Sequence, residues 1–383
     1  MYYLDHNATS PLRPEAGAAM THALGIGGNP SSVHAAGRTA HAVIETAREQ
    51  VAALAGVRAQ DVIFTSGGSE ANALGLCGAI YGALEVDKRI TRLFVSSIEH
   101  DSVLANAHAL TERVPGLRVE MLPVTANGVI DPEGVRVALR EGKGRALVAA
   151  MAANNETGVV QPISEFRKYT LDGDALLLVD AVQAAGKMQL DIDADYITLS
   201  AHKLGGPQGV GALILKDDAP FAAQLLGGGQ ERGHRAGTQN VAGIAGFGAA
   251  AEKALTDIAQ TDAIAVLRDR FEVGLKTMAA EALIFGEKTS RLPNTSNFAL
   301  PGVSAENALM ALDLDGVMIS SGAACSSGKV RPSHVLAAMG VDDATARSAL
   351  RVSLGWNSTQ ADIDAALASL TKIVARTTAR AAA

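Results

Sequence analysis

Two short apolar runs in the middle of the sequence lead into residues that can do chemistry. Residues 176–179 precede Asp180, and residues 196–199 precede Ser200 and Lys203. Both runs have the length and composition of buried strands. Because ligands of open α/β sheets bind at the carboxyl ends of parallel strands, we expect these polar side chains to face one crevice.

A carboxylate and a lysine in such a crevice suggest cofactor chemistry. Asp180, at the end of a buried strand, needs a cationic partner, and Lys203 in a partly dry pocket is shifted toward its nucleophilic neutral form. Pyridoxal phosphate (PLP) uses both groups, since it forms a Schiff base with a lysine and keeps its ring nitrogen protonated opposite a carboxylate. An ordinary Asp–Lys ion pair beside a turn is the alternative that these two residues leave open.

A glycine-rich turn, residues 66–70, follows the apolar run 62–65 and precedes an Ala/Leu-rich helical segment, residues 71–81. A strand, a glycine-rich turn and a helix start together favour phosphate binding, because free amide groups and the helix dipole stabilise an anion. The spacing matches neither a Walker A motif nor a dinucleotide fingerprint. A plain turn with Ser69 as helix cap is the alternative.

Further polar residues follow other predicted strands. His100 comes after the run 93–97, where it could stack on an aromatic cofactor or move protons, or simply be a satisfied polar residue. Asn155 follows the apolar run 145–153, where it could bind a ligand oxygen or form a tight turn. The glycine-rich, charged segment 226–238 is predicted to be a loop that meets an anion or a neighbouring subunit.

The two cysteines have different surroundings. Cys77 lies in an apolar helical segment, which predicts an inert buried side chain. Cys325 lies among small polar residues with basic residues close behind, which favours an accessible thiolate, although a surface cysteine in a turn is also possible. Arg351 interrupts the apolar run 350–354, so an inward arginine there needs a carboxylate, which a substrate could supply.

The composition limits the class of protein. The chain has 383 residues, 48% hydrophobic, and a net charge of −7 without a Lys/Arg-rich run, which argues against nucleic-acid binding. No apolar run reaches the roughly 18 residues of a membrane helix. Two distant cysteines and an N-terminus unlike a signal peptide suit a reducing cytoplasm, with neither a disulfide framework nor a cysteine-rich metal site.

Eight motifs along nearly the whole chain resemble those of the cysteine desulfurases, PLP-dependent enzymes of the class V aminotransferase superfamily. The motifs are Leu4-Asp5-His6-Asn7-Ala8-Thr9, Gly28-Asn29-Pro30-Ser31-Ser32-x-His34, Phe64-Thr65-Ser66-Gly67-x-Ser69-Glu70, Glu99-His100, Asn154-Asn155-Glu156-x-Gly158, Asp180-x-x-Gln183, Ser200-x-His202-Lys203 and Ser320-Ser321-Gly322-x-Ala324-Cys325. The sequence departs from the usual pattern in three places: Gly68-Ser69 stands for Ala-Thr, Asn72-Ala73 for Asp-Asn, and His6 for Tyr.

The resemblance implies an α/β protein of PLP-dependent transferase fold type I. Its large PLP-binding domain, residues 13–256, would contain a mostly parallel seven-stranded sheet flanked by helices. A smaller α+β domain would combine residues 1–12 and 257–383 and carry Cys325 on a mobile loop of about residues 320–332. The chain would form a homodimer.

The resemblance also implies roles for single residues. Lys203 would form the Schiff base, His100 would stack on the ring, and Cys325 would accept sulfur. The cofactor-binding residues would be Gly68, Ser69, His100, Asn155, Asp180, Gln183, Ser200, His202, Lys203 and Thr238, the last from the other subunit. Asn155 and Arg351 would hold the substrate carboxylate, and no metal ligand is expected.

The implied reaction converts L-cysteine to L-alanine and leaves a persulfide on Cys325. The persulfide would supply an iron–sulfur scaffold or another thiolation acceptor in the cytoplasm, without nucleic-acid or membrane partners. A selenocysteine lyase or another class V aminotransferase using Lys203 and Asp180 is the alternative enzyme. A non-enzymatic sulfur carrier, in which Cys325 only receives sulfur, is the alternative of a different class.

Overall fold

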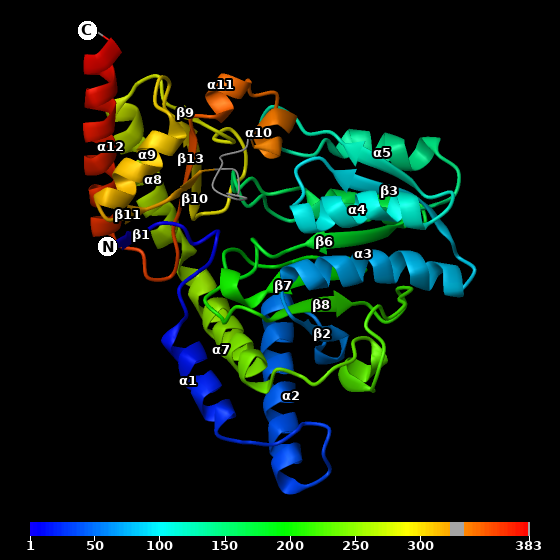
Figure 1. Cartoon of the computed structure of the whole chain (residues 1–383). Helices are drawn as coiled ribbons and strands as arrows, with labels where there is room; N and C mark the ends of the chain where they lie inside the picture. Colours follow the sequence, from blue (N-terminus) through cyan, green and yellow to red (C-terminus); the bar gives the residue numbers. More distant parts are fainter. Residues whose placement is uncertain (322–332, 382–383) are drawn as a thin grey trace.

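A seven-stranded sheet lies at the centre of the larger part of the computed structural model, which describes residues 1–321 and 333–381 (Figure 1). All strands run parallel except β8, which is antiparallel to both of its neighbours. This confirms the fold class expected from the sequence. In spatial order the strands are β2 (Val62–Thr65), β8 (Gly211–Leu215), β7 (Tyr196–Ser200), β6 (Leu176–Asp180), β5 (Arg145–Met151), β3 (Ile90–Ser96) and β4 (Arg118–Leu122).

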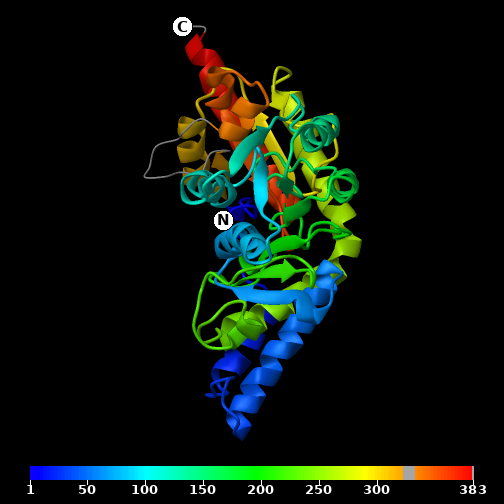
Figure 2. The ribbon, with the colours of Figure 1, turned by 90° about the vertical axis from the view of Figure 1, so that its right-hand side faces the viewer.

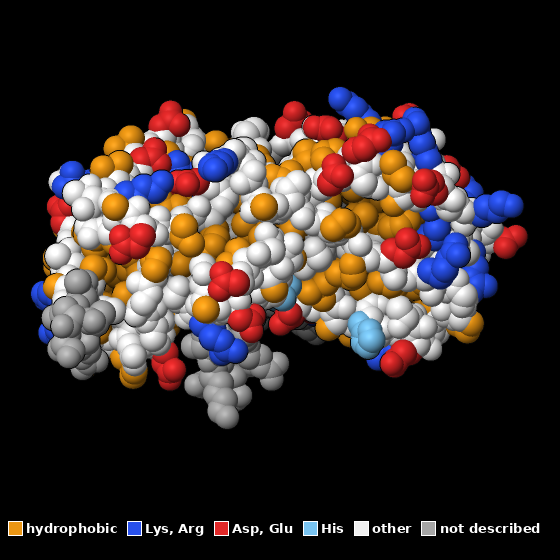
Figure 3. All heavy atoms as spheres, turned by 90° about the horizontal axis from the view of Figure 1, so that it is seen from above, with side chains coloured by type: hydrophobic (Ala, Val, Ile, Leu, Met, Phe, Trp, Pro, Cys, Tyr) orange, Lys and Arg blue, Asp and Glu red, His pale blue; other side chains and the backbone are white. Residues whose placement is uncertain are grey.

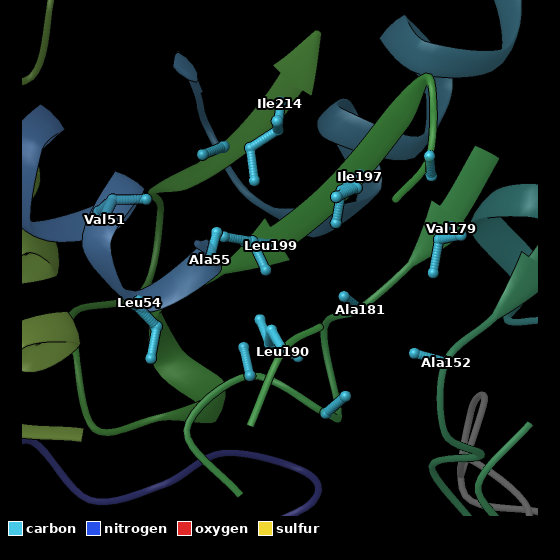
Figure 4. Close-up of a cluster of buried hydrophobic side chains, with 14 of the residues drawn as sticks. Val51, Leu54, Ala55, Ala152, Val179, Ala181, Leu190, Ile197, Leu199 and Ile214 are labelled. Atoms are coloured by element: carbon cyan, nitrogen blue, oxygen red, sulfur yellow. The ribbon is translucent and has the colours of Figure 1, made fainter. Parts of the chain in front are cut away.

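Helices cover both faces of this sheet, which explains why its inner strands consist mostly of apolar residues. Leu177 and Val179 of β6 belong to one buried cluster, and Leu176 and Leu178 belong to another, as expected when successive side chains alternate. Figure 4 shows the first cluster, where α2 side chains lie against β7 and β8. The helices are α1 (Pro14–Leu24), α2 (Ala35–Ala55), α3 (Gly68–Glu85), α4 (Asp101–Arg113), α5 (Pro132–Glu141), α6 (Ile163–Asp172) and α7 (Val241–Asp257).

A smaller antiparallel sheet lies beside the large one, with its own buried cluster (Figure 1). Its strands in order are β12 (Ser320–Ser321), β13 (Ala349–Ser353), β10 (Thr295–Ala299) and β9 (Leu283–Ile284), and a separate pair joins β1 (Tyr2–Tyr3) to β11 (Val317–Met318). The accompanying helices are α8 (Thr261–Met278), α9 (Ala305–Leu314), α10 (His334–Ala338), α11 (Asp343–Ala346) and α12 (Gln360–Ala381). Short 3-10 turns are η1 (Ala59–Asp61), η2 (Ala201–Lys203), η3 (Gln230–Gly233) and η4 (Ile258–Gln260).

The N-terminal segment connects the two sheets. Asp5 forms an isolated bridge with Ser353 of β13, and the Ser10 amide donates to the His202 carbonyl beyond β7. Figure 2 shows the N-terminus near the middle of the molecule. The first residues of the chain therefore lie between the two sheets, close to the ends of the predicted catalytic strands.

The surface is mixed in charge, and the helices are those of a protein without a membrane-length apolar helix among the described residues. Seen from above (Figure 3), acidic and basic side chains occur side by side, with hydrophobic side chains between them. Among the described residues, no helix is both long and apolar enough to cross a membrane.

Candidate active site

A cavity of about 940 Å³ opens at the carboxyl ends of the parallel strands. It lies where the general geometry of α/β sheets places ligands. Residues predicted from the sequence to form the site meet in its walls, although the first and the last of them are more than 280 residues apart in the chain. These are Gly68, Ser69, His100, Asn155, Asp180, Gln183, Ser200, His202, Lys203 and Arg351.

The N-terminus of α3 can hold an anion at one end of this cavity. Gly67 is the helix N-cap with a φ of 153°, and no described side chain caps the first turn, so Ser69 is not the cap. A β-carbon added at Gly68 would lie 3.2 Å from Cβ of Ser200, so glycine keeps this approach open. The free amides and the buried Ser200 hydroxyl therefore form a cradle suited to phosphate.

His202 lies next to this cradle and is neutral. Its Nδ1 is 3.2 Å from the Thr9 hydroxyl oxygen. Burial, assisted by the positive charge of Lys203, lowers the pKa of His202 to about 4. A neutral imidazole can still donate one hydrogen bond to an anion without adding charge.

Asp180 ends β6 and is oriented from two sides. One carboxylate oxygen accepts from the Val182 amide at 2.9 Å, and the other accepts from Asn72 Nδ2 at 2.7 Å. The Thr198 hydroxyl donates to Asn72 Oδ1 at 2.6 Å, which fixes that amide. Asn72 thus holds the carboxylate toward the cavity, where it can face a cationic ring nitrogen. Asn72 is one of the departures from the family pattern, and its amide donates a hydrogen bond to Asp180.

Lys203 reaches the same cavity from the turn after β7. Its amine donates to the main-chain oxygens of Asn7 and Ala8, both at 2.7 Å. Burial, reinforced by the charge of Arg351, lowers the pKa of Lys203 to about 8, although Asp5 and Asp180 oppose the shift. The amine is therefore closer to its nucleophilic form than an exposed lysine.

His100 presents an exposed ring to the cavity. It caps α4, where the Ser102 amide donates to His100 Nδ1 at 3.1 Å. The preceding residue, Glu99, is fully buried and accepts from the Met151 amide at 2.6 Å. Burial and the nearby charge of Asp180 raise the pKa of Glu99 well above its usual value. The sequence predicts no role for Glu99, although its position three residues after β3, beside His100, could have indicated one.

Arg351 projects from β13 into the wall opposite the strand ends. Its guanidinium donates to Asp5 Oδ1 at 2.7 Å and to the main-chain oxygen of Asn155 at 3.0 Å. Asp5 therefore supplies the carboxylate that the sequence pattern required. Arginine carries five N–H donors, so these two contacts leave others for a ligand carboxylate.

Two predicted residues are not part of these walls. Thr238 is exposed in the loop between β8 and α7, outside the described lining of the cavity, and its contact with a partner subunit stays a prediction. Cys325 lies outside the described residues, as does the whole segment 322–332. The residues that flank this segment, Ser321 and Ser333, both line the cavity.

Comparisons with known proteins identify the family to which this chain belongs. A family model described as aminotransferase class-V matches residues 2–366. A cysteine desulfurase of Cereibacter sphaeroides is 44% identical over 377 residues, 97% of this chain and 95% of the relative. An IscS-like cysteine desulfurase of Mycobacterium tuberculosis is 39% identical over 381 residues, 98% of this chain and 97% of the relative. The solved structure of a NifS-like protein from Rickettsia africae is 33% identical with a TM-score of 0.87, covering 98% of this chain and 99% of that one. The chain therefore belongs to the cysteine desulfurases of the aminotransferase class-V family.

Proposed function

We propose that the protein converts L-cysteine to L-alanine with PLP as cofactor and transfers the sulfur to Cys325 as a persulfide. One observation carries this proposal. A lysine, a carboxylate and an uncapped helix N-terminus, the three groups that PLP requires, lie in the walls of a single cavity. Family membership supports the same activity.

The cavity residues fit this cofactor. Its phosphate would lie at the first turn of α3, its ring nitrogen opposite Asp180 and its ring against His100, with Lys203 as the Schiff-base lysine. Gln183 and Asn155 would donate to the phenolic oxygen. The phosphate contacts would be Gly68, Ser69, Ser200, His202 and, from the other subunit of a homodimer, Thr238. When bound, PLP withdraws electrons from the substrate and so weakens the bonds at its reacting carbons.

The chain's own residues then carry the remaining steps. Arg351 and Asn155 would orient the substrate carboxylate, and the Lys203 amine would move the proton at the α-carbon. The Cys325 thiolate attacks the substrate sulfur, so that a sulfur–sulfur bond forms as the carbon–sulfur bond breaks. The carbon keeps the electron pair of the broken bond and takes up a proton, so that the product leaves as alanine and no external reductant is needed.

Three further features belong to this proposal. The domains would be residues 13–256 and residues 1–12 with 257–383, which is supported by the pairing of β1 with β11. A homodimer is supported by the exposed position of Thr238, outside the described walls of its own cavity. The sulfur acceptor would be an iron–sulfur scaffold or another thiolation protein of the cytoplasm, as the resemblance implies.

The test measures sulfide and alanine released from L-cysteine with a reductant. Wild type is expected to give equal amounts, and Cys325→Ala to lose both products while the visible cofactor band persists. Cys77→Ala is the matched control. The Cys77 thiol is half-buried within α3, so its removal should leave turnover unchanged. Undiminished turnover in Cys325→Ala would instead indicate another lyase or an aminotransferase. Absence of a cofactor band from wild type would favour the non-enzymatic sulfur carrier.

A further inference from the structure

Asn7 in the N-terminal segment contacts two of the predicted cofactor residues with a single atom. Its main-chain oxygen accepts from Lys203 Nζ at 2.7 Å and from Gln183 Nε2 at 2.9 Å. Asn7 is itself only 1% exposed. The resting position of the Lys203 amine and the orientation of the Gln183 amide therefore depend on the same carbonyl group.

Lys187 completes this network from behind. Its amine donates to Asn7 Oδ1 at 3.0 Å and to Gln183 Oε1 at 2.5 Å. Lys187 lines a separate cavity of about 240 Å³ and is not among the described walls of the 940 Å³ cavity. It can therefore act on a ligand in the larger cavity only through its neighbours.

These contacts decide which way the Gln183 amide points. Its oxygen faces the Lys187 amine, and its nitrogen faces the Asn7 carbonyl. If the amide were reversed, its oxygen would face the Asn7 carbonyl oxygen, and its nitrogen would face the Lys187 amine, so two acceptors and two donors would oppose each other. Because the amide nitrogen has a second hydrogen, this orientation leaves one donor free for a ligand.

The charges around Lys187 suit a neutral donor. None of the described carboxylates forms an ion pair with its amine. Burial, together with the charges of Lys203 and Arg351, lowers the pKa of Lys187 well below its usual value. Lys187 can thus supply hydrogen bonds without placing another positive charge beside Lys203.

We propose that Lys187 is a positioning residue that, through Asn7 and Gln183, fixes the amide donor for the cofactor's phenolic oxygen and the carbonyl on which Lys203 rests. This inference rests on the proposed PLP site. It adds a role for a buried lysine outside the reacting groups.

The first test is Lys187→Met, because methionine keeps much of the aliphatic length and removes the amine. The PLP-loaded variant is titrated with base in the absence of substrate while the visible cofactor band is followed. We expect the midpoint to rise by about one pH unit, because Gln183 then competes less with the proton at Lys203 for the phenolic oxygen. The exposed Lys88→Met is the matched control and should titrate like wild type.

The second test asks whether Lys187 acts through Gln183. With L-cysteine, Lys187→Met is expected to lower kcat about 10-fold with little change in KM, as for a residue that orients another. The double variant with Gln183→Ala should then be no slower than Gln183→Ala alone. An unchanged midpoint in a folded variant, or additive losses in the double variant, would overturn the proposal.

Two precautions keep the tests decisive. If Lys187→Met does not fold, Lys187→Leu replaces it in the same titration, since leucine also lacks a hydrogen-bond donor. The titration uses no substrate, so it still judges Lys187 if wild type makes no alanine. A wild type that makes no alanine would reject the proposed desulfurase activity. The midpoint of the cofactor-band titration would still decide whether Lys187 is a positioning residue.

Discussion

The two sides of the active-site cavity are built in different ways. On one side, Asp180 and Ser200 end β6 and β7, so the hydrogen-bond ladder of the large sheet places them. On the other side, Arg351 lies within β13 of the small sheet, but its guanidinium is oriented by Asp5, and the Glu156 carboxyl group is held by Ser333. The ends of the large sheet's strands therefore place the first group of side chains, whereas single polar contacts between distant segments orient the charged groups of the second. We expect the first to hold the cofactor and the second to recognise the substrate.

The largest effect should come from the amine on the strand-end side. Lys203→Ala removes both the Schiff-base amine and the group that moves the α-proton. We expect alanine formation to fall by at least ~10³-fold, at the upper part of the range for loss of a general base. Alanine release and the visible cofactor band measure this, with the exposed Lys88→Ala as control. Activity within tenfold of wild type would mean that another amine does this work.

The second effect concerns the carboxylate on the same side. Asp180→Asn keeps the shape and one of the two hydrogen bonds that Asp180 accepts from Val182 and Asn72, but it removes the negative charge that would face the ring nitrogen. We expect kcat to fall by about 10²-fold, as when a preorganised electrostatic contact is lost. Steady-state kinetics and cofactor stoichiometry together separate slower chemistry from weaker PLP binding. Wild-type kcat in a fully loaded variant would contradict the assigned role of Asp180.

The opposite side should show a different kinetic signature. Arg351→Leu removes a charged partner of the substrate carboxylate and also leaves Asp5 without its ion pair. We expect KM for L-cysteine to rise about 10-fold or more, with a smaller change in kcat. Arg270→Leu, which breaks an exposed ion pair with Asp364, is the control. A loss confined to kcat would remove the distinction between the two sides.

The strand-end side was the part most open to prediction from sequence. The apolar runs at 62–65, 176–179 and 196–199 correspond to β2, β6 and β7 within one residue, because strands covered on both faces need continuous apolar sequence. The polar residues that follow two of these runs then meet at one edge of the sheet. The residues alone suggested the PLP roles of Lys203 and Asp180, whereas most other single-residue roles came from the resemblance. All of these roles stay predictions.

The contacts behind the site could not be predicted in the same way. Asn7 joins Lys203, Gln183 and Lys187 through separations of more than 170 residues, and no local period in the sequence marks such contacts. The place of Asn72 in the site could have been predicted, since it lies one helical turn after Gly68 in α3. Ser69 as helix cap was a wrong alternative, because Gly67 takes that position with a backbone conformation that favours glycine.

The smallest predicted effect is a pH dependence of stability on the substrate side. Glu156 is buried there and accepts a hydrogen bond from Ser333. Burial raises the pKa of Glu156 to about 7, against the opposing effects of Ser333 and Arg351. In the folded protein Glu156 therefore keeps its proton at pH 6, whereas in the unfolded chain it is already ionised.

The folded state binds more protons than the unfolded state between these pKa values, so stability must fall as the pH rises. From pH 6 to pH 8, Glu156 should lower the free energy of unfolding by about 1 kcal/mol. Urea unfolding at both pH values measures this, and Glu156→Gln should lose that part of the pH dependence because its amide does not titrate. The exposed Glu133→Gln should keep it, since Glu133 has a lowered pKa and is ionised throughout this range. An equal slope in wild type and Glu156→Gln would show that this side of the cavity does not hold a proton at Glu156.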